Sequence, residues 1–234
     1  MDRYCAAVVV PTLNNDTIFE VVKSVRDLGY EIVVVDDGSN SLVAAKLETD
    51  EKTHIITHPR NLGKGAALKS GANKAKELGY SYFVSMDADR QHLPREICKL
   101  TDAINYGDDT IVIGARDFEI DNVPNGSKIG RSISNFWAIL DTSCKITDSL
   151  SGFRLYPVSI LNLPIKSIKF DWEMEVLVKH AWLKKQIVET TVQCYYPKAE
   201  ERVSHFKKWR DTVSIVWLHI KLLPFRLLLF KGFI

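Results

Sequence analysis

Short, unbroken apolar runs alternate with segments of helical periodicity over the first half of this chain. Cys5–Val10 is one such run, ended by Pro11, and the predicted strand Glu31–Val35 holds a second, Ile32–Val35, ended by acidic residues. A strand that is apolar at every position is buried on both faces, as strands are in parallel sheets covered by helices. Residues 18–28 carry apolar side chains at helical spacing and end at Gly29. The alternation predicts an α/β fold with a mostly parallel sheet, helices on both faces and right-handed crossovers.

Acidic residues follow two of these strands. Asp36 and Asp37 end the second run, and the strand at Tyr82–Met86 runs into Asp87 and Asp89. Ligands of open parallel sheets bind outside the carboxyl ends of the strands. Residues i and i+2 of an extended segment point to the same side, so Asp87 and Asp89 can share one Mg²⁺ or Mn²⁺ ion, which suggests a phosphorylated ligand such as a nucleotide. Asp-x-Asp is also common in loops, where aspartate caps a turn.

Three more stretches carry chemistry-bearing residues. Lys64 lies between two glycines at the start of a predicted helix, an arrangement that favours a phosphate but also suits a flexible turn. Arg154 follows Ser151-Gly152-Phe153, and its guanidinium either binds phosphate or is buried against Asp148. Asp171, Glu173 and Glu175 share a face if they end a strand, and suit the dipole if they start a helix.

The middle of the chain adds a loop and further helices. We expect a helix at about 95–105, a strand at 110–114, a polar loop at 118–127 and a helix from about 129 to 140. The loop contains Pro124, Asn125 and Gly126, which favour irregular backbone. The last of these helices carries Arg131 near its start.

Composition limits the class of protein. The 234 residues are 46% hydrophobic and 26% charged, which fits one domain. A net charge of +2 gives no general attraction for nucleic acid, so we expect no nucleic-acid partner. The four cysteines form no Cys-x-x-Cys pair and are expected to be reduced cytosolic thiols. The N-terminal residues are interpreted as a core strand and not as a secretory signal.

The C-terminal segment, residues 211–234, is apolar and basic. It is long enough to suggest a membrane span, but Lys221, Arg226 and Lys231 recur through it and Pro224 breaks the helix. The pattern fits a segment that lies in the interface of an anionic membrane. The alternative is a terminal helix that packs on the domain, residues 1–210, or on a second subunit.

The motifs together resemble the family 2 glycosyltransferases, most closely the branch that contains dolichyl-phosphate mannosyltransferases and other polyprenyl-phosphate glycosyltransferases. The resemblance covers roughly residues 5–210. Six motifs carry it in the order seen in the family: Val10-Pro11-Thr12-Leu13-Asn14-Asn15, Val35-Asp36-Asp37-Gly38-Ser39, Asn61-Leu62-Gly63-Lys64-Gly65-Ala66, Met86-Asp87-Ala88-Asp89-Arg90-Gln91-His92-Leu93-Pro94, Ser151-Gly152-Phe153-Arg154 and Phe170-Asp171-Trp172-Glu173-Met174-Glu175. The first motif departs from the family, which usually has Glu where Asn15 stands.

The resemblance implies a GT-A (Rossmann-like) fold, a GDP- or UDP-sugar donor, a Mg²⁺ or Mn²⁺ cofactor and inversion at the anomeric carbon. The acceptor implied is a polyprenyl or dolichyl phosphate, met by a peripheral protein on the cytosolic face of a membrane. The implied roles are nucleotide binding for Pro11, Leu13, Asp36, Asp37, Lys64, Asp87 and Ala88, metal binding for Asp87, Asp89 and Gln91, and contact with the acceptor phosphate for Arg116, Arg131, Ser151, Arg154 and Arg202. A phosphate acceptor is already anionic, whereas a hydroxyl needs a base, for which Glu173, Asp148 and Asp171 are the candidates, Glu173 first.

Three other functions stay open. A glycan or protein hydroxyl could be the acceptor in place of a lipid phosphate. A nucleotidyltransferase that makes sugar nucleotides would share the α/β layout. Such enzymes usually have a Gly-rich loop after the first strand, however, and residues 11–15 contain no glycine. A non-catalytic nucleotide-sugar binder would be expected to lack metal or acceptor residues, and Asp87, Asp89 and Arg154 are present.

Overall fold

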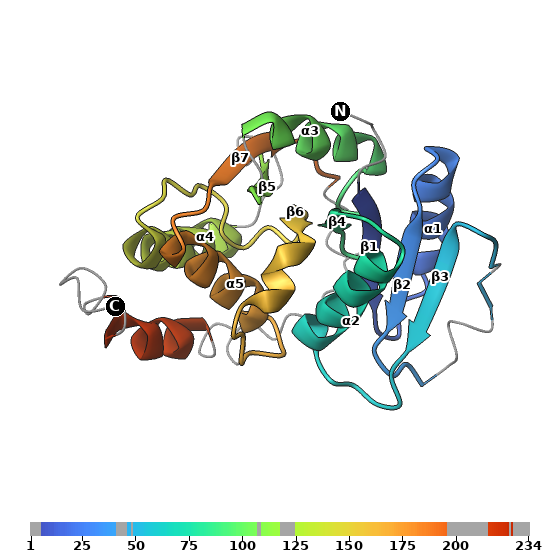
Figure 1. Ribbon diagram of the computed structural model, residues 1–234, viewed down its shortest axis with the longest axis horizontal. Helices are drawn as coiled ribbons and strands as arrows, with labels where there is room; N and C mark the ends of the chain where they lie inside the picture. Colours follow the sequence, from blue (N-terminus) through green and yellow to red (C-terminus); the bar gives the residue numbers. More distant parts are fainter. Residues whose placement is uncertain are drawn as a thin grey trace.

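The apolar runs form the centre of one seven-stranded sheet. The computed structural model describes residues 6–40, 46–47, 49–106, 109–117, 125–195, 215–224 and 226. The strands lie in the order β3-β2-β1-β4-β6-β5-β7 (Figure 1). Only β6 runs against its neighbours in this sheet, and the other pairings are parallel. The strands are β1 (Ala6–Thr12), β2 (Ile32–Asp36), β3 (Thr53–Thr57), β4 (Tyr82–Ser85), β5 (Ile111–Arg116), β6 (Arg154–Pro157) and β7 (Ile187–Val192).

Helices cover both faces of the sheet, as expected. On one face α1 and α3 pack over the even-numbered side chains of the central strands, such as Val8 and Val84. On the other face α2, α4 and α5 pack over the odd-numbered side chains, such as Val9 and Phe83. This division follows from the two-residue repeat of a strand. The helices are α1 (Ile18–Asp27), α2 (Lys64–Glu77), η1 (Pro94–Glu96), α3 (Ile97–Asp102), η2 (Ala103–Tyr106), α4 (Asn125–Thr142), η3 (Val158–Asn162) and α5 (Asp171–Trp182).

The structure differs from the expected elements in three places. The helix expected at 95–105 is two 3₁₀ turns that flank a short α3. The loop expected to reach residue 127 ends earlier, because α4 begins at Asn125, while residues 118–124 lie outside the described residues. Strands β6 and β7 had no counterpart among the expected strands. Strand β6 is only four residues long and begins with the buried Arg154, and that polar start hides its strand character.

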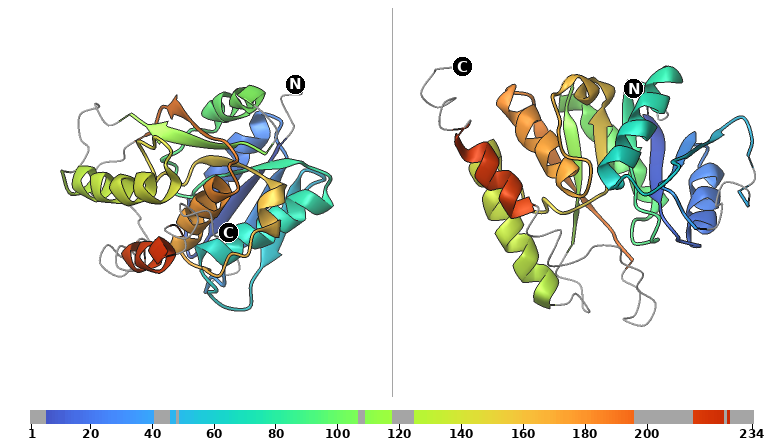
Figure 2. Two further views of the ribbon diagram at one scale, coloured as in Figure 1. Left: turned by 60° about the vertical axis from the view of Figure 1, so that its left-hand side comes forward. Right: turned by 90° about the horizontal axis from the view of Figure 1, so that it is seen from below.

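The C-terminal segment contributes a helix over residues 215–224. This helix lies beside α4, where the ring of His219 stacks on Trp137 at 5.7 Å between centroids (Figure 2). His219 also pairs through Nδ1 with a carboxylate oxygen of Asp141, and both side chains are fully buried. No helix among the described residues is both long enough and apolar enough to cross a bilayer. One side of the helix over residues 215–224 thus packs on the domain.

A buried histidine makes stability depend on pH. His180 of α5 is buried, and its Nε2 lies 3.2 Å from the carbonyl oxygen of Gln186. Burial lowers the pKa of His180 to about 4, below the usual value of 6.5. The unfolded chain therefore takes up this proton first, so the contribution of His180 is complete above pH 6.5 and is lost as the pH falls towards 4. Urea unfolding at pH 7 and pH 5 should show a larger loss of stability for the wild type than for His180→Gln, and equal losses would contradict this prediction.

Candidate active site

The polar residues predicted from the sequence gather at one edge of the sheet. The parallel strands β1, β2, β4 and β5 all present their carboxyl ends there. Because β6 is antiparallel, the segment that leads into it, residues 151–153, reaches the same edge. The first residues of α2 and α5 also contribute, through Lys64 and Glu173, which lie within ion-pair distance of one another. Segments that are far apart in the sequence therefore form one site.

Asp37 fixes the start of α2. Its two carboxylate oxygens accept the backbone N–H groups of Leu62 and Gly63, at 3.0 and 2.8 Å, and one of them also contacts Nδ1 of His58 at 2.7 Å. Gly63 has φ of +108°, where a side chain would also meet the carbonyl oxygen of Ile168. A carboxylate at a helix N-terminus suits the dipole. Both carboxylate oxygens of Asp37, a residue expected to bind nucleotide, therefore accept hydrogen bonds from the protein itself.

Two buried oxygens at the ends of β1 and β2 have no protein partner among the described residues. They are Oγ1 of Thr12 and Oδ2 of Asp36, and these two residues are register partners across the strand pair. The other oxygen of Asp36 accepts the N–H of Ser39 at 2.9 Å. Buried polar atoms are normally paired, so such orphans need an explanation. A ligand that donates hydrogen bonds would satisfy them, beside buried Pro11 and half-buried Leu13.

Asn15 joins the loop after β1 to the loop after β4. Its Nδ2 donates to the carbonyl oxygen of Ala88 at 3.2 Å, while its Oδ1 accepts the N–H and the hydroxyl of Thr17. The hydroxyl of Thr17 also contacts the Ala88 carbonyl. An asparagine can both donate and accept here, which a glutamate at this position could not do when ionised. Ala88 is thus held at the site through its backbone.

Lys64 lies between two carboxylates. Its Nζ is 2.7 Å from Oδ1 of Asp87 and 3.0 Å from Oε2 of Glu173. Burial alone would lower the pKa of the Lys64 ammonium, but the charges of Asp87 and Glu173 outweigh burial and raise it above its usual value. Lys64 similarly offsets burial at Asp87 and lowers the pKa of that carboxyl. Oε1 of Glu173 is buried and has no partner among the described residues.

Asp89 has a different environment from Asp87. Its Oδ1 accepts the backbone N–H of Gln91 at 3.0 Å, which closes a turn. Burial, followed by the negative charge of Asp87, raises the pKa of Asp89 to about 6. Two carboxylates that repel each other are arranged as a cation would require. Among the described residues no three histidine, cysteine or acidic side chains form a metal-binding group, but Mg²⁺ commonly uses only one or two carboxylates.

Asp148 is not placed as a catalytic base. It is fully buried, and its oxygens accept Nε, Nη2 and the backbone N–H of Arg116, at 2.8, 2.9 and 3.0 Å. A bidentate pair of this kind is among the strongest hydrogen-bonded arrangements of these two groups. The sequence analysis gave a buried pair of Arg154 and Asp148 as an alternative. The structure corrects this alternative, because Asp148 pairs with Arg116.

Arg154 and Ser151 do not lie where an acceptor phosphate could reach them. The guanidinium of Arg154 is 1% exposed and donates to the carbonyl oxygens of residues 149, 151 and 173 and to the hydroxyl of Tyr156. Ser151 is equally buried and donates to the carbonyl oxygen of Gly114 at 2.7 Å. Both side chains hold backbone segments together. Arg131 lies half-buried on α4, and Arg202 lies outside the described residues.

The three acids near residue 173 have separate roles, because they start a helix. Asp171 accepts the N–H of Lys169 at 3.2 Å in the turn before α5. Glu175 accepts the N–H groups of Lys166 and Ser167 and pairs with Lys179 at 2.6 Å. Only Glu173 faces the cluster of Lys64 and Asp87. The helical reading, in which at least one acid suits the dipole, is the correct one.

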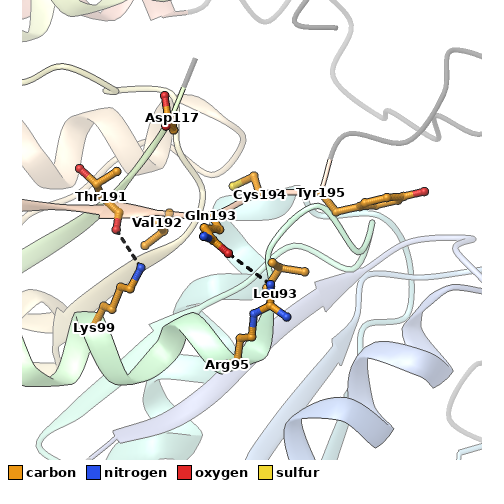
Figure 3. A pocket seen from close by; sticks show the side chains of 9 residues that line it. All are labelled: Leu93, Arg95, Lys99, Asp117, Thr191, Val192, Gln193, Cys194 and Tyr195. Carbon is orange, nitrogen blue, oxygen red and sulfur yellow. Dashed lines mark hydrogen bonds between the residues drawn. The ribbon is translucent and has the colours of Figure 1, made fainter. Parts of the chain in front are cut away.

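A cavity of about 570 Å³ lies among the segments that follow β4, β5 and β7 (Figure 3). It is lined by residues that follow β4 and β5 and by the end of β7, with Arg95 and Lys99 on one wall. Arg95 donates to the side chain of Gln193, and Lys99 donates to the carbonyl oxygen of Thr191 (Figure 3). Cys194 contributes its thiol to the opposite wall (Figure 3). The cavity is separate from the orphan oxygens on β1 and β2.

Gly152 provides space that Asp87 and Lys64 occupy. A Cβ at Gly152 would lie 2.6 Å from Oδ2 of Asp87 and 2.8 Å from Nζ of Lys64. Both groups end flexible side chains, so Gly152→Ala should displace them with little loss of stability and lower ligand binding at least tenfold. The control is Gly130→Ala, which meets nothing within 4 Å in α4 and should gain about 1 kcal/mol in stability. Isothermal titration with nucleotide and thermal melts check both; unchanged binding in Gly152→Ala would contradict the prediction.

Several residues at the site were not singled out from the sequence. Thr12 lies inside the first motif, and its place at a strand end could have indicated it. Gly152 and His92 also lie inside motifs, but the charged or polar residues beside them were the ones assigned to roles. Cys194 contacts His92 across 102 positions of sequence, and no local pattern could have indicated that contact.

Comparisons with known proteins agree with this arrangement. Residues 7–162 match the model of the family described as Glycosyl transferase family 2. The chain is 28% identical to a UDP-N-acetylglucosamine–dolichyl-phosphate N-acetylglucosaminyltransferase of Methanococcus voltae, over 80% of this chain and 84% of the relative. It is 31% identical to a dolichol-phosphate mannosyltransferase of Pyrococcus furiosus, over 76% of this chain and 53% of that protein.

Solved structures show the same fold. A glucosyl-3-phosphoglycerate synthase from Mycobacterium tuberculosis, crystallised with Mn²⁺, UDP and glucosyl-3-phosphoglycerate, is similar with a TM-score of 0.67 at 17% identity, over 94% of this chain and 79% of that chain. The expected GT-A fold is therefore confirmed. The family model covers well over half of the chain. This protein belongs to glycosyl transferase family 2 and is a glycosyltransferase.

Proposed function

We propose that this glycosyltransferase moves a sugar from a nucleoside diphosphate sugar to a polyprenyl phosphate. The transfer would invert the anomeric carbon and use a divalent cation. The observation that carries the proposal is the convergence of two features at one sheet edge. The orphan oxygens of Thr12 and Asp36 suit the N–H and hydroxyl groups of a nucleoside. The carboxylates of Asp87 and Asp89 stand at the end of β4, two strand positions from Asp36. A nucleoside bound at the first feature would direct its diphosphate to the second.

The residues present fit Mg²⁺ or Mn²⁺. Asp87 and Asp89 supply hard oxygen donors, and a cation would offset both the burial of Asp89 and its repulsion by Asp87, which together raise its pKa. Gln91 lies in the same turn and would add its amide oxygen. When bound, the ion would stabilise the charge that develops on the leaving diphosphate. A structurally similar glucosyl-3-phosphoglycerate synthase was crystallised with Mn²⁺ and UDP, which supports a divalent cation at this site.

Lys64 and Glu173 supply the remaining charges. Lys64 is a cation held next to Asp87, and a diphosphate that arrives at this carboxylate would gain a second positive neighbour. Glu173 lies on the far side of Lys64, and its Oε1 has no partner in the described part of the chain. With a phosphate acceptor, which is already ionised, no base is needed, and Glu173 would hold Lys64 in place through their ion pair.

A hydroxyl acceptor is the second candidate, and one observation favours it. The oxygen Oε1 of Glu173 is a buried acceptor that has no partner among residues the structure describes, which is what a base for a hydroxyl would offer. Two of the groups expected on the acceptor phosphate, Arg154 and Ser151, are meanwhile committed to the protein. Arg116 is held by its pair with Asp148, so the lipid phosphate would then depend on Arg131 and on Arg202, which lies beyond the described residues. Relatives named for dolichyl phosphate still support the lipid.

A transfer assay separates these acceptors. Purified protein would be given Mg²⁺ or Mn²⁺, radiolabelled UDP- and GDP-sugars, and polyprenyl phosphate or unphosphorylated polyprenol. We expect label in the organic phase with the phosphate, and its loss when EDTA is added. Label that enters polyprenol in preference to its phosphate would overturn the lipid-phosphate proposal and favour Glu173 as a base.

The membrane would be met through two neighbouring helices. On α4 the side chains of Ile133, Phe136 and Ile139 are exposed at a spacing of three, and the helix over 215–224 exposes Trp217 and Ile220. Lys221 lies over the ring of Trp217. Exposed apolar rows with a cation beside them are typical of helices that lie in an anionic interface. We propose that these rows hold the enzyme on the cytosolic face of a membrane.

Flotation with vesicles tests this attachment. The double variant Phe136→Ser, Trp217→Ser should bind vesicles that contain phosphatidylglycerol at least about tenfold more weakly. Burial of each aromatic side chain stabilises the bound state by about 1.5–3 kcal/mol. Leu183→Ser is the matched control, because Leu183 is 57% exposed but lies at the end of α5. Equal flotation of all three proteins would contradict a role for these helices.

A further inference from the structure

His92 connects the cavity wall to the carboxylate of Asp87. Its ring is 4% exposed and stacks on Phe153 with centroids 5.0 Å apart. Nδ1 lies 3.6 Å from Sγ of Cys194, and Nε2 lies 3.9 Å from Oδ2 of Asp87. The loop that carries His92 also bridges to the segment after β7, where the N–H of Tyr195 donates to the carbonyl of Gln91 at 2.8 Å. The imidazole thus has the Cys194 thiol at one nitrogen and the Asp87 carboxylate facing the other.

The chemistry of the neighbours favours one tautomer of the His92 ring. A carboxylate can only accept hydrogen bonds, so the tautomer that suits Asp87 carries its hydrogen on Nε2, which faces Oδ2 from 3.9 Å. Nδ1 is then a bare acceptor, and the thiol of Cys194 is the donor that meets it. Burial raises the pKa of Cys194 to about 12, so this thiol keeps its hydrogen at neutral pH. A thiol is a weak donor, but no competing partner of Nδ1 stands within bonding distance in the part of the chain that the structure describes.

We propose that His92 is a positioning residue for Asp87, and that the Cys194 thiol sets its tautomer. Asp87 is pulled from two sides, by Lys64 at Oδ1 and by the Nε2–H of His92 near Oδ2. The distance of 3.9 Å exceeds a direct hydrogen bond, and a small closure or one water would complete it. Metal ligands are commonly oriented in this way by groups behind them. The proposal rests on the proposed metal role of Asp87.

The tautomer can be measured without metal or substrate. Long-range ¹H–¹⁵N NMR of the metal-free protein, with His92 assigned from His92→Gln, distinguishes Nε2–H from Nδ1–H. We expect Nε2–H in the wild type and in Cys194→Ser, which keeps a donor, and a mixture of tautomers in Cys194→Ala. Cys98→Ala is the matched control, because the Cys98 thiol donates to a helix carbonyl of Arg95 and not to a ring. An Nδ1–H tautomer in the wild type, or no change in Cys194→Ala, would overturn the proposal.

Manganese binding separates this inference from the proposed function. Electron paramagnetic resonance titration should show Mn²⁺ affinity in the presence of UDP or GDP lowered threefold to tenfold in Cys194→Ala and tenfold or more in His92→Gln, with rescue in Cys194→Ser. Asp87→Asn should lose binding altogether. If Asp87→Asn loses binding while His92→Gln and Cys194→Ala do not, the metal site stands and the positioning role fails. If Asp87→Asn binds as the wild type does, the metal assignment fails.

Discussion

Replacing Asp89 by alanine is expected to abolish Mn²⁺-dependent nucleotide binding and to lower transfer roughly 10²–10³-fold, while the protein stays folded. The carboxylate of Asp89 is placed to share a cation with Asp87, and burial together with the charge of Asp87 raises its pKa to about 6. Titration calorimetry with UDP and GDP, each with and without Mn²⁺, gives the binding, and the label assay gives the transfer.

Asp89→Asn is the control that isolates the charge. The amide oxygen of this variant can still accept the N–H of Gln91 and keep the turn. Because the folded pKa of Asp89 is raised, its ionisation costs stability above pH 6, so Asp89→Asn should melt at a higher temperature than the metal-free wild type at pH 7. Binding as strong in Asp89→Asn as in the wild type would show that the ion does not use this carboxylate.

Replacing Arg154 by alanine is expected to unfold much of the protein, because this side chain supports the fold. It would leave three buried carbonyl oxygens and the Tyr156 hydroxyl without their donor, at about 1–3 kcal/mol for each group. That sum approaches the 5–15 kcal/mol by which a whole domain is stable. Chemical denaturation measures the loss directly.

The comparison with Arg95→Ala shows whether position or residue type matters. The side chain of Arg95 is 67% exposed, so its removal should change stability by less than about 0.5 kcal/mol. Arg154→Lys should recover little, since an ammonium cannot match the planar fork of the guanidinium. If Arg154→Ala melted like the wild type and only raised the KM for polyprenyl phosphate, the side chain would be an acceptor ligand as the family resemblance implies.

The amino-acid sequence by itself determined the central sheet and its functional edge. Runs such as Ile32–Val35 are apolar at every position, and that pattern has one stable solution, a strand buried on both faces. Asp36, Asp87 and Asp89 follow such strands directly, so their meeting at one edge follows from the parallel order. Local pattern was sufficient here because the positions are set by the strands that carry them.

Only the tertiary structure decided which polar groups are free to act. Arg154 and Asp148 are close in sequence, yet Arg154 is committed to backbone carbonyls while Asp148 pairs with Arg116 from another strand. The helical start of α5 likewise left only Glu173 facing the site. Burial and the choice of hydrogen-bond partner depend on contacts between distant segments. The sequence cannot reveal them, because a side chain has the same type and charge whether it is free to bind a ligand or already bound to protein groups. Those contacts separate the binding residues from the ones that hold the fold.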